Sequence, residues 1–392
     1  MKIDKSRPAH WLYLALFAVN VVMAIVWRRI RRPGQLRGRC VVLYGHKLNG
    51  NLLALYEYLR KHESDIEVVF LTMDPAYHRA LESKGTASVL ALSPACARLL
   101  GRARAIISDH GLHVMKWLLG RRDIRFFDVW HGIPFKGFDA DDFRLQHCYD
   151  ETWVASELLA RMYVSRFGFR PGRVRATGYA RTDRLVERTE DVDALKRRFG
   201  LDGEDVGRIV LFAPTWKQDS QKRSLYPFGL GEEEFFATLS GVARRHRATF
   251  VMRAHLNSGE SPRTSMDRIV FRSHGAWPDT EGLLLVSDIL VCDWSSIAFD
   301  YLLLNRPAVF LDVPAPFAKG FSLGPEYRFG DIVPDMQALT HALDRYLGSP
   351  QTWQQEFAST ARSIRQQVYG DRADGQSSRR CVERLRSAID SA

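Results

Sequence analysis

The chain has 392 residues, of which 46% are hydrophobic and 26% charged, and this composition excludes an intrinsically disordered protein. Lys plus Arg exceed Asp plus Glu by 56 − 45 = 11, so an anionic partner is expected: anionic lipid, a phosphorylated substrate or nucleic acid. The five cysteines are scattered without a CxxC pair, which argues against a disulfide framework or a zinc site and favours a reducing compartment.

The first predicted element is the apolar segment His10 to Trp27, whose only strongly polar interior residue is Asn20. As a helix it would be about 27 Å long, just short of the hydrocarbon core of a bilayer. A cleaved signal peptide is disfavoured because arginines stand where small residues should form the cleavage site. A half-inserted amphipathic helix is disfavoured because Leu, Val and Ala occupy all faces. We therefore predict that residues 1–32 form a membrane anchor and that a chain lacking them still folds.

The charges around this segment predict its orientation in the cell membrane. Six arginines lie between Arg28 and Arg39, against Lys2, Lys5 and Arg7 on the other side. The C-terminal side should therefore be cytoplasmic. We expect a single-pass or peripheral membrane protein whose basic excess also holds it against an anionic membrane surface.

Beyond Pro33, short apolar runs alternate with helical patterns. Strands are predicted at 39–45, 66–72, 87–92, 102–109, 124–130, 151–156 and 173–178, and then at 208–214, 248–255, 268–273, 288–293 and 306–312. Such runs are typical of parallel sheets covered on both faces. We predict an α/β protein with two Rossmann-like, doubly wound domains at 33–205 and 206–349 and a basic helical tail at 350–392.

Polar residues stand at several predicted strand ends, where open α/β sheets bind ligands. The stretch WHGIPFKGF (130–138) contains His131 and Lys136, and RAHLN (253–257) contains Arg253 and His255. The stretches ATGYARTDRL (176–185) and APTWKQD (213–219) also follow strands. For any one of these histidines, a buried structural role is the alternative.

The stretch SDILVCDWSSIAFD (287–300) places Asp293, Ser295 and Ser296 where a strand meets a helix. Hydroxyls and free backbone N–H groups at such a junction can bind a phosphate or pyrophosphate. The alternative is that one serine only caps the helix.

These residues suit phosphoryl transfer, which requires positioning and neutralisation of charge on phosphate oxygens. Arg253, Lys136 and Lys217 are candidate phosphate ligands, with a solvated surface charge as the alternative for each. An imidazole with a pKa near 6.5 can accept a hydroxyl proton at cellular pH. Asp139 and Asp141 form a DxD pattern, for which we favour a capping or surface role. We predict no catalytic metal and no other cofactor.

The ordered set of motifs resembles the CDP-glycerol glycerophosphotransferases of teichoic acid and capsule synthesis. WHGIPFK, GYARTD, APTW, RAH and SDILVCDWSS with FDYLLLNRP follow the family's order between residues 40 and 330. Five positions depart from the family pattern: Ile133, Ala180, Thr182, Leu256 and Trp294. Thr182 and Leu256 lie near the expected donor site, which bears on the identity of the alditol.

The resemblance implies a GT-B fold and the transfer of glycerol phosphate from CDP-glycerol to a hydroxyl of a lipid-linked or polymeric acceptor, with release of CMP. It assigns His131 as the general base, His255 as a histidine that contacts the donor phosphates, and Ser295 and Ser296 as phosphate-binding residues. The other expected donor-binding residues are Lys136, Arg181, Thr215, Lys217, Arg253 and Asp293. The acceptor is expected on the first domain and the donor on the second.

Four alternatives stay open. The donor could be CDP-ribitol, or the chain could be a GT-B glycosyltransferase that uses a nucleotide sugar. A non-catalytic scaffold on the same fold is a third reading, although the histidines and serines it should have lost are present. The positive charge also suggests nucleic-acid binding, but no recognised motif supports it, and we predict no nucleic-acid partner.

Overall fold

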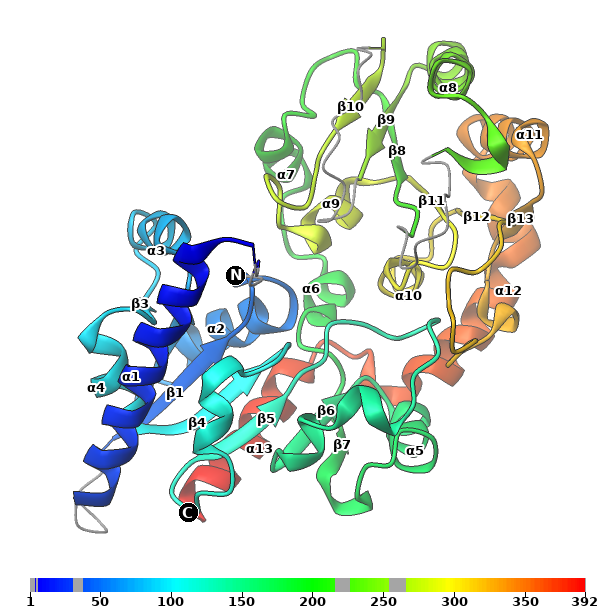
Figure 1. The fold of residues 1–392 in the computed structure, drawn as a ribbon. Coiled ribbons are helices and arrows are strands. Elements are labelled where there is room, and N and C mark those ends of the chain that lie inside the picture. The colour runs from blue at the N-terminus through cyan, green and yellow to red at the C-terminus, as the bar shows by residue number, and fades with distance from the viewer. Residues whose placement is uncertain (1–3, 5, 31–37, 216–225, 254–265, 392) are drawn as a thin grey trace. The chain divides into compact units, whose positions relative to one another are not determined.

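The computed structural model describes residues 4, 6–30, 38–215, 226–253 and 266–391. The chain divides into two compact units (Figure 1). Unit 1 comprises Met1–His131, Asp139–Asp183 and Arg372–Ala392, and unit 2 comprises Gly132–Phe138 and Arg184–Asp371. Each unit is built around its own parallel β-sheet.

Unit 1 contains a seven-stranded sheet with the strand order β3-β2-β1-β4-β5-β6-β7. Its strands are β1 (Arg39–Tyr44), β2 (Ile66–Thr72), β3 (Ser88–Leu90), β4 (Ala103–Ser108), β5 (Arg125–Asp128), β6 (Glu151–Val154) and β7 (Val174–Ala176). The chain moves outward from β1 to β3 and then returns to the other side of β1 at β4. This reversal is the switch point of a doubly wound sheet, where ligands bind at the carboxyl ends of the strands.

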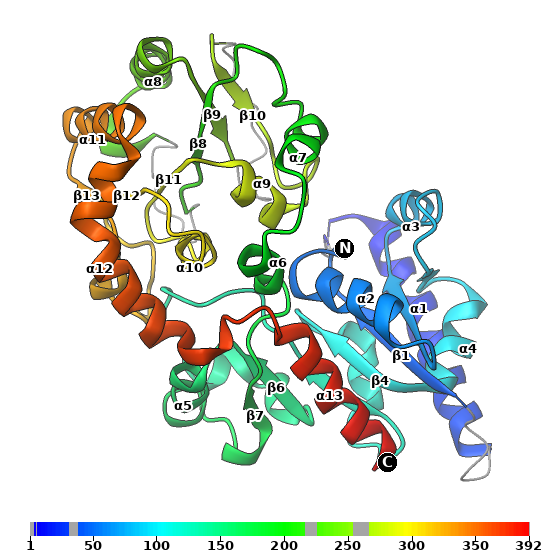
Figure 2. The ribbon, with the colours of Figure 1, turned by 180° about the vertical axis from the view of Figure 1, so that it is seen from behind.

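Both faces of this sheet are covered, which explains its nearly continuous apolar strands. Alternate residues of β1 point to opposite faces: Val42 and Tyr44 belong to one buried cluster, and Val41 and Leu43 to another. The first cluster is covered by α1 (Pro8–Ile30), α4 (Pro94–Arg102) and the 3-10 helix η1 (His113–Leu118). The second is covered by α2 (Gly50–His62), α3 (Pro75–Glu82) and α13 (Ser377–Asp390). Figure 1 shows α1 and α4 on one side of the sheet, and Figure 2 shows α2 and α13 on the other.

Unit 2 contains a six-stranded parallel sheet with the order β10-β9-β8-β11-β12-β13, which is again doubly wound. Its strands are β8 (Arg208–Phe212), β9 (Ala248–Met252), β10 (Ile269–Phe271), β11 (Ile289–Cys292), β12 (Ala308–Leu311) and β13 (Asp331–Val333). Its helices are α7 (Val192–Phe199), α8 (Glu232–His246), α9 (Thr280–Val286), α10 (Ile297–Leu302), α11 (Met336–Gly348) and α12 (Pro350–Tyr369). Unit 1 also contains α5 (Glu157–Ser165), and α6 (Thr182–Glu187) begins at the end of unit 1.

The predicted α/β class with two doubly wound parallel sheets is confirmed, and each predicted strand range contains a strand. β13 was not predicted, because three residues of which only Val333 is buried give no apolar run. The expected boundary near residue 205 differs from the observed one. α7 packs against α9, and Arg184 pairs with Asp279, so the chain from residue 184 onward belongs to unit 2.

The expected basic tail is also part of the two units. α12 packs in unit 2 against α10 and α11. α13 returns to unit 1, where the backbone N–H groups of Ser377 and Ser378 donate to the Asp183 carboxylate at 2.8 and 2.7 Å. Because α13 covers one face of the first sheet, its arginines are held by acidic residues of that unit, as in the pair of Arg384 with Glu151.

The N-terminal helix α1 is long and apolar enough to cross a membrane by length and composition. It is also a covering helix of unit 1, because Phe17, Val21 and Ala24 are fully buried in the same cluster as the strand residues Val42 and Tyr44. Removing it would uncover that face of the sheet. We therefore no longer expect a chain that lacks residues 1–32 to fold normally.

Candidate functional site

Three histidines lie side by side at the carboxyl ends of neighbouring strands in unit 1. His46 follows β1, His110 follows β4, and His131 follows β5. The ring centroids of His46 and His110 are 4.4 Å apart with the planes tilted by 49°, and those of His110 and His131 are 4.8 Å apart with the planes stacked at 9°. The switch point of the sheet thus holds a histidine stack, and His131 is its exposed member.

Charge is distributed unevenly along this stack. His110 donates from Nδ1 to the buried Asp109 carboxylate at 2.7 Å. Burial opposes a charge on His110, but the Asp109 hydrogen bond outweighs it and raises the pKa of His110 above its ordinary value. Burial and the charge of His110 lower the pKa of His46 to about 4. The middle ring is therefore more readily protonated than His46.

The same two causes act on His131. Burial and then the charge of His110 lower the pKa of His131, while the charge of Asp109 acts in the opposite direction. His131 is exposed to solvent, so water weakens this desolvation, and the direction of the pKa shift stays downward. A lowered pKa keeps the imidazole neutral at cellular pH, as a general base requires.

The backbone around His131 is fixed by two side chains. Arg181 donates from Nη1 to the His131 carbonyl at 2.9 Å, and Asn51 donates to the carbonyls of Val129 and Trp130 at 2.7 and 2.8 Å. Asn51 also accepts from the backbone N–H of Arg181 at 3.1 Å, which joins the two supports. Arg181, expected at the donor, is buried and holds the segment that carries His131.

One hydrogen bond also selects the tautomer of His131. Nδ1 lies 3.3 Å from the Asp109 carbonyl oxygen. A carbonyl only accepts, so Nδ1 carries the proton and Nε2 is left as a proton acceptor.

The segment that follows His131 belongs to unit 2. Phe135 stacks on Phe299 of α10 with centroids 4.5 Å apart and meets the Trp294 ring edge-on at 5.9 Å. Gly137 donates from its backbone to the Gly320 carbonyl at 2.7 Å. A Cβ at Gly137 would lie 2.5 Å from the same oxygen, so only glycine fits this contact. Lys136 is half-buried and forms an isolated antiparallel bridge with Phe321.

The predicted phosphate seat forms a tight turn after β11. Asp293 is buried and accepts from the backbone N–H groups of Thr215 and Trp294, both at 2.6 Å. This carboxylate ties the end of β8 to the end of β11, which are neighbours in the sheet. Ser296 occupies the N-cap position of α10 with no side-chain cap hydrogen bond, and Ser295 and Ser296 are both half-buried. The capping alternative for Ser296 is therefore not what the structure shows.

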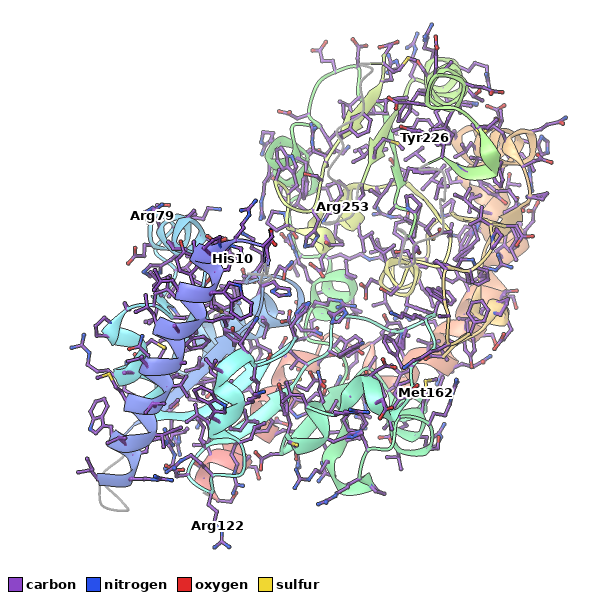
Figure 3. The ribbon with its side chains drawn as sticks, in the orientation of Figure 1. His10, Arg79, Arg122, Met162, Tyr226 and Arg253 are labelled. Atoms are coloured by element: carbon purple, nitrogen blue, oxygen red, sulfur yellow. The ribbon has the colours of Figure 1, made fainter. Side chains whose placement is uncertain are left out.

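Arg253 differs from its expected role as a phosphate ligand. Its guanidinium is buried and donates to the Trp277 carbonyl and the Thr280 hydroxyl at 2.7 Å, and it lies 3.0 Å from His274 Nδ1. Figure 3 shows Arg253 inside unit 2, beside α9. A direct phosphate contact would require this network to open. Lys217 and His255 lie outside the described residues.

Four further residues were missed in the sequence: His46, Asp109, His110 and Asp128. The Asp128 carboxyl is fully buried, and burial raises its pKa to about 8. His46 follows β1, Asp109 and His110 follow β4, and Asp128 ends β5, and the doubly wound order makes β1, β4 and β5 successive strands of the sheet. That rule, applied to GHK (45–47) and SDHG (108–111), would have predicted the stack.

The DxD pattern has the predicted capping role, since Asp139 caps a 3-10 helix (Ala140–Phe143) by accepting from Asp141 N. Within the described ranges, no group of three or more His, Cys, Asp or Glu side chains is arranged to hold a metal ion.

Comparison with known proteins decides the family. A model of the family CDP-glycerol:poly(glycerophosphate) glycerophosphotransferase matches residues 36–387. The chain belongs to this family.

Curated relatives agree with this membership. The chain is 24% identical to a teichoic acid glycerol-phosphate transferase of Staphylococcus aureus, over 87% of this chain and 90% of the relative. It is 25% identical to a teichoic acid poly(ribitol-phosphate) polymerase of Bacillus spizizenii, over 67% of this chain but only 43% of that longer protein. The family therefore contains relatives named for either alditol at similar identity.

Among solved structures, the wall teichoic acid polymerase TagF matches with a TM-score of 0.75 and 18% identity, covering 98% of this chain and 99% of the TagF chain. This likeness shows that the two chains share a fold, the GT-B arrangement that the motifs implied.

Proposed function

We propose that this glycerophosphotransferase family member transfers glycerol phosphate from CDP-glycerol to a hydroxyl of a lipid-linked or polymeric acceptor in the synthesis of a teichoic-acid-like or capsular polymer. Family membership and the staphylococcal relative support the reaction class. A TagF structure described as soaked with CDPG supports the donor. The observation that carries the proposal is the exposed His131 at the end of the histidine stack, with a lowered pKa and an unprotonated Nε2.

The reaction balances with the residues present. His131 Nε2 accepts the proton of the acceptor hydroxyl, and that oxygen forms a bond to the phosphorus that carries glycerol. The bond from this phosphorus to the bridging oxygen breaks, and CMP leaves with that oxygen. Such a transfer depends on positioning and on neutralising phosphate charge. We assign the second requirement to the turn formed by Asp293 to Ser296, with Lys136, Thr215, Lys217 and His255 as further donor-binding residues.

We place the acceptor on unit 1 and the donor on unit 2. A nucleotide donor also implies a cytoplasmic reaction, so we place the catalytic units at the cytoplasmic face of the cell membrane. Family relatives act on teichoic acid, a cell-envelope polymer, which agrees with this location.

A donor comparison tests the proposal. The purified full-length chain is incubated with a lipid-linked acceptor and with CDP-glycerol, CDP-ribitol or a UDP-sugar, and nucleotide release is measured. CDP-glycerol should be consumed fastest. Preference for CDP-ribitol would change the alditol and keep the reaction, whereas exclusive use of the UDP-sugar would contradict the proposal.

The pH dependence of the reaction should report the histidine stack. Neutral His131 is the active form, so kcat/KM should fall as pH drops through the pKa of His131, with a midpoint below the ordinary value near 6.5. In His110→Gln, the charge that lowers this pKa is absent, so the midpoint should move to higher pH. Exposed His62 on α2 supplies the control, and His62→Gln should leave the profile unchanged. An unchanged midpoint in His110→Gln would exclude this coupling.

The hydroxyls of Ser295 and Ser296 should contribute to the affinity for the donor and contribute little to the stability of the fold. Replacing Ser295 and Ser296 together by alanine removes two hydroxyls from the proposed phosphate seat. We expect the Kd for CDP-glycerol to rise about tenfold or more, because a hydrogen bond to a charged group contributes about 1.5–3 kcal/mol. The melting temperature should change little, since Ser296 makes no side-chain cap. Titration calorimetry that shows wild-type affinity for CDP-glycerol would remove the serines from the donor site.

A further inference from the structure

The segment Gly132–Phe138 continues the chain from the histidine stack into unit 2. His131 belongs to unit 1, the next seven residues belong to unit 2, and the chain returns to unit 1 at Asp139. Figure 1 and Figure 2 both show the connection that follows β5 passing beside α10. The residue proposed as the general base is therefore joined by a single peptide bond to a segment that packs in the other unit.

The backbone of this segment pairs with the chain that follows β12. Gly137 donates to the Gly320 carbonyl at 2.7 Å, and Ser322 donates to the Phe135 carbonyl at 2.8 Å. The pairing is antiparallel, so the two stretches form a short ribbon. The ribbon fixes the course of the segment within unit 2.

Phe135 makes the main side-chain contacts of the segment. Its ring is buried and stacks on Phe299 with the centroids 4.5 Å apart. It also meets the Trp294 ring edge-on at 5.9 Å. Both are geometries in which aromatic rings attract each other beyond the burial of their area. Phe135 thus packs against the residue that directly precedes Ser295, in the turn to which we assign the donor phosphates.

Trp294 is itself held in one orientation. Its backbone N–H donates to the Asp293 carboxylate at 2.6 Å, and its indole Nε1 donates to the Val313 carbonyl at 2.8 Å. The Arg328 guanidinium lies over the same ring, 4.5 Å from the ring centroid. Because both its backbone and its side chain are bonded, Trp294 offers Phe135 a fixed surface.

The link between Phe135 and His131 is short and stiff. Only Gly132, Ile133 and Pro134 separate them, and all three are buried. Four residues of chain span at most about 14 Å, so a fixed Phe135 limits how far His131 can move. Pro134 has a fixed φ and restricts Ile133 to extended conformations, which removes much of the remaining freedom. A displacement of Phe135 is therefore passed on to His131.

We infer that Phe135 is a positioning residue of the transfer reaction, which holds His131 in place through its packing against Trp294 and Phe299. Arg181 and Asn51 fix the chain on the unit 1 side of His131, and Phe135 fixes it on the unit 2 side. A displacement of about 1 Å at a reacting group can lower a rate about 100-fold, so the loss of one support should reduce turnover. The inference rests on the role proposed for His131.

Truncation of the ring tests this role. In Phe135→Ala the turnover number should fall at least about tenfold, whereas the Kd for CDP-glycerol should change less than about threefold, because Trp294 keeps its own hydrogen bonds. Phe135→Leu keeps an apolar side chain at this place and should restore turnover to within about twofold of the wild type. Phe236→Ala on α8 is the matched control, because Phe236 is an equally buried ring of unit 2 that packs on Phe271. It should lower the melting temperature and leave turnover unchanged.

A double variant separates positioning from general damage. His131→Ala has no base to position, so adding Phe135→Ala to it should lower turnover by less than about twofold further. Gly137→Ala provides a second perturbation that leaves the core rings in place, because its Cβ would meet the carbonyl oxygens of Lys319 and Gly320 and displace the ribbon. It should show the same pattern. Wild-type turnover in a folded Phe135→Ala protein, or an equal fall with and without His131, would overturn the inference.

Histidine NMR gives a readout that needs neither donor nor acceptor. The His131 signal is assigned by its disappearance in His131→Ala, and its pKa is measured by titration. Burial and the charge of His110 lower the pKa of His131, so a less firmly held ring should have a higher pKa in Phe135→Ala than in the wild type. Phe236→Ala should leave this pKa unchanged. An unchanged pKa in Phe135→Ala would overturn the inference, whereas a wild-type chain that releases no CMP would contradict the proposed function alone.

Discussion

His131→Ala is expected to lower the turnover number by about 100-fold or more, the range that a positioned general base contributes. The Kd for CDP-glycerol should change little, because the proton that His131 accepts belongs to the acceptor. The ring is exposed and stacks on His110 from one side, so its loss should leave the melting temperature nearly unchanged. Steady-state kinetics, donor calorimetry and thermal unfolding on the same preparation measure the three quantities.

His62→Ala is the matched control, because it removes another exposed histidine of unit 1 and should change none of the three. A purely structural His131 would instead lower the melting temperature and affect turnover and donor affinity together. A stable His131→Ala protein with near-normal turnover would contradict the assignment of the base.

The second large effect should be on stability. Arg28→Met removes the buried guanidinium that joins α1 to two backbone carbonyls and to Asp123, and we expect a loss of about 3 kcal/mol in the free energy of unfolding. For a unit of this size the melting temperature should fall by roughly 10 °C. Differential scanning calorimetry measures this shift.

The neighbouring residue provides the control for Arg28. Arg29 is exposed, so Arg29→Met should change the free energy of unfolding by less than about 0.5 kcal/mol. Equal, small effects of the two variants would show that α1 is only loosely attached to unit 1.

The sheets could be predicted from the sequence because strands that are buried on both faces consist of continuous apolar runs. β1 and β8 are buried along almost their whole length, and both lie within predicted ranges. β13 failed this test, since its residues are mostly exposed or half-buried. The unit boundaries could not be predicted in the same way. α13 belongs to unit 1 and Gly132–Phe138 belongs to unit 2 because of tertiary contacts, and such contacts leave no local signal in the sequence.

The candidate site was predicted in part for the same reason. His131 and the serine turn carry motifs that a single stretch of sequence displays. His110 becomes informative only when β4 is known to lie between β1 and β5, because only then does it stack on His131. For Arg253 the sequence predicted a role that the structure does not show. Its charge suggested that it binds a phosphate, but the Trp277 carbonyl and the Thr280 hydroxyl accept its hydrogen bonds. The packing of one face of α1 against unit 1 was not predicted. Both faces of this helix are apolar, so only the tertiary packing distinguishes them.

The most direct test of the central claim is to identify which bond of CDP-glycerol breaks. The full-length protein is incubated with CDP-glycerol and a lipid-linked acceptor, the nucleotide product is identified by chromatography, and the acceptor product is examined by phosphorus NMR. Transfer of glycerol phosphate predicts CMP and a new phosphodiester on the acceptor in equal amounts. Release of CDP, or of CMP without a phosphodiester on the acceptor, would contradict the claim.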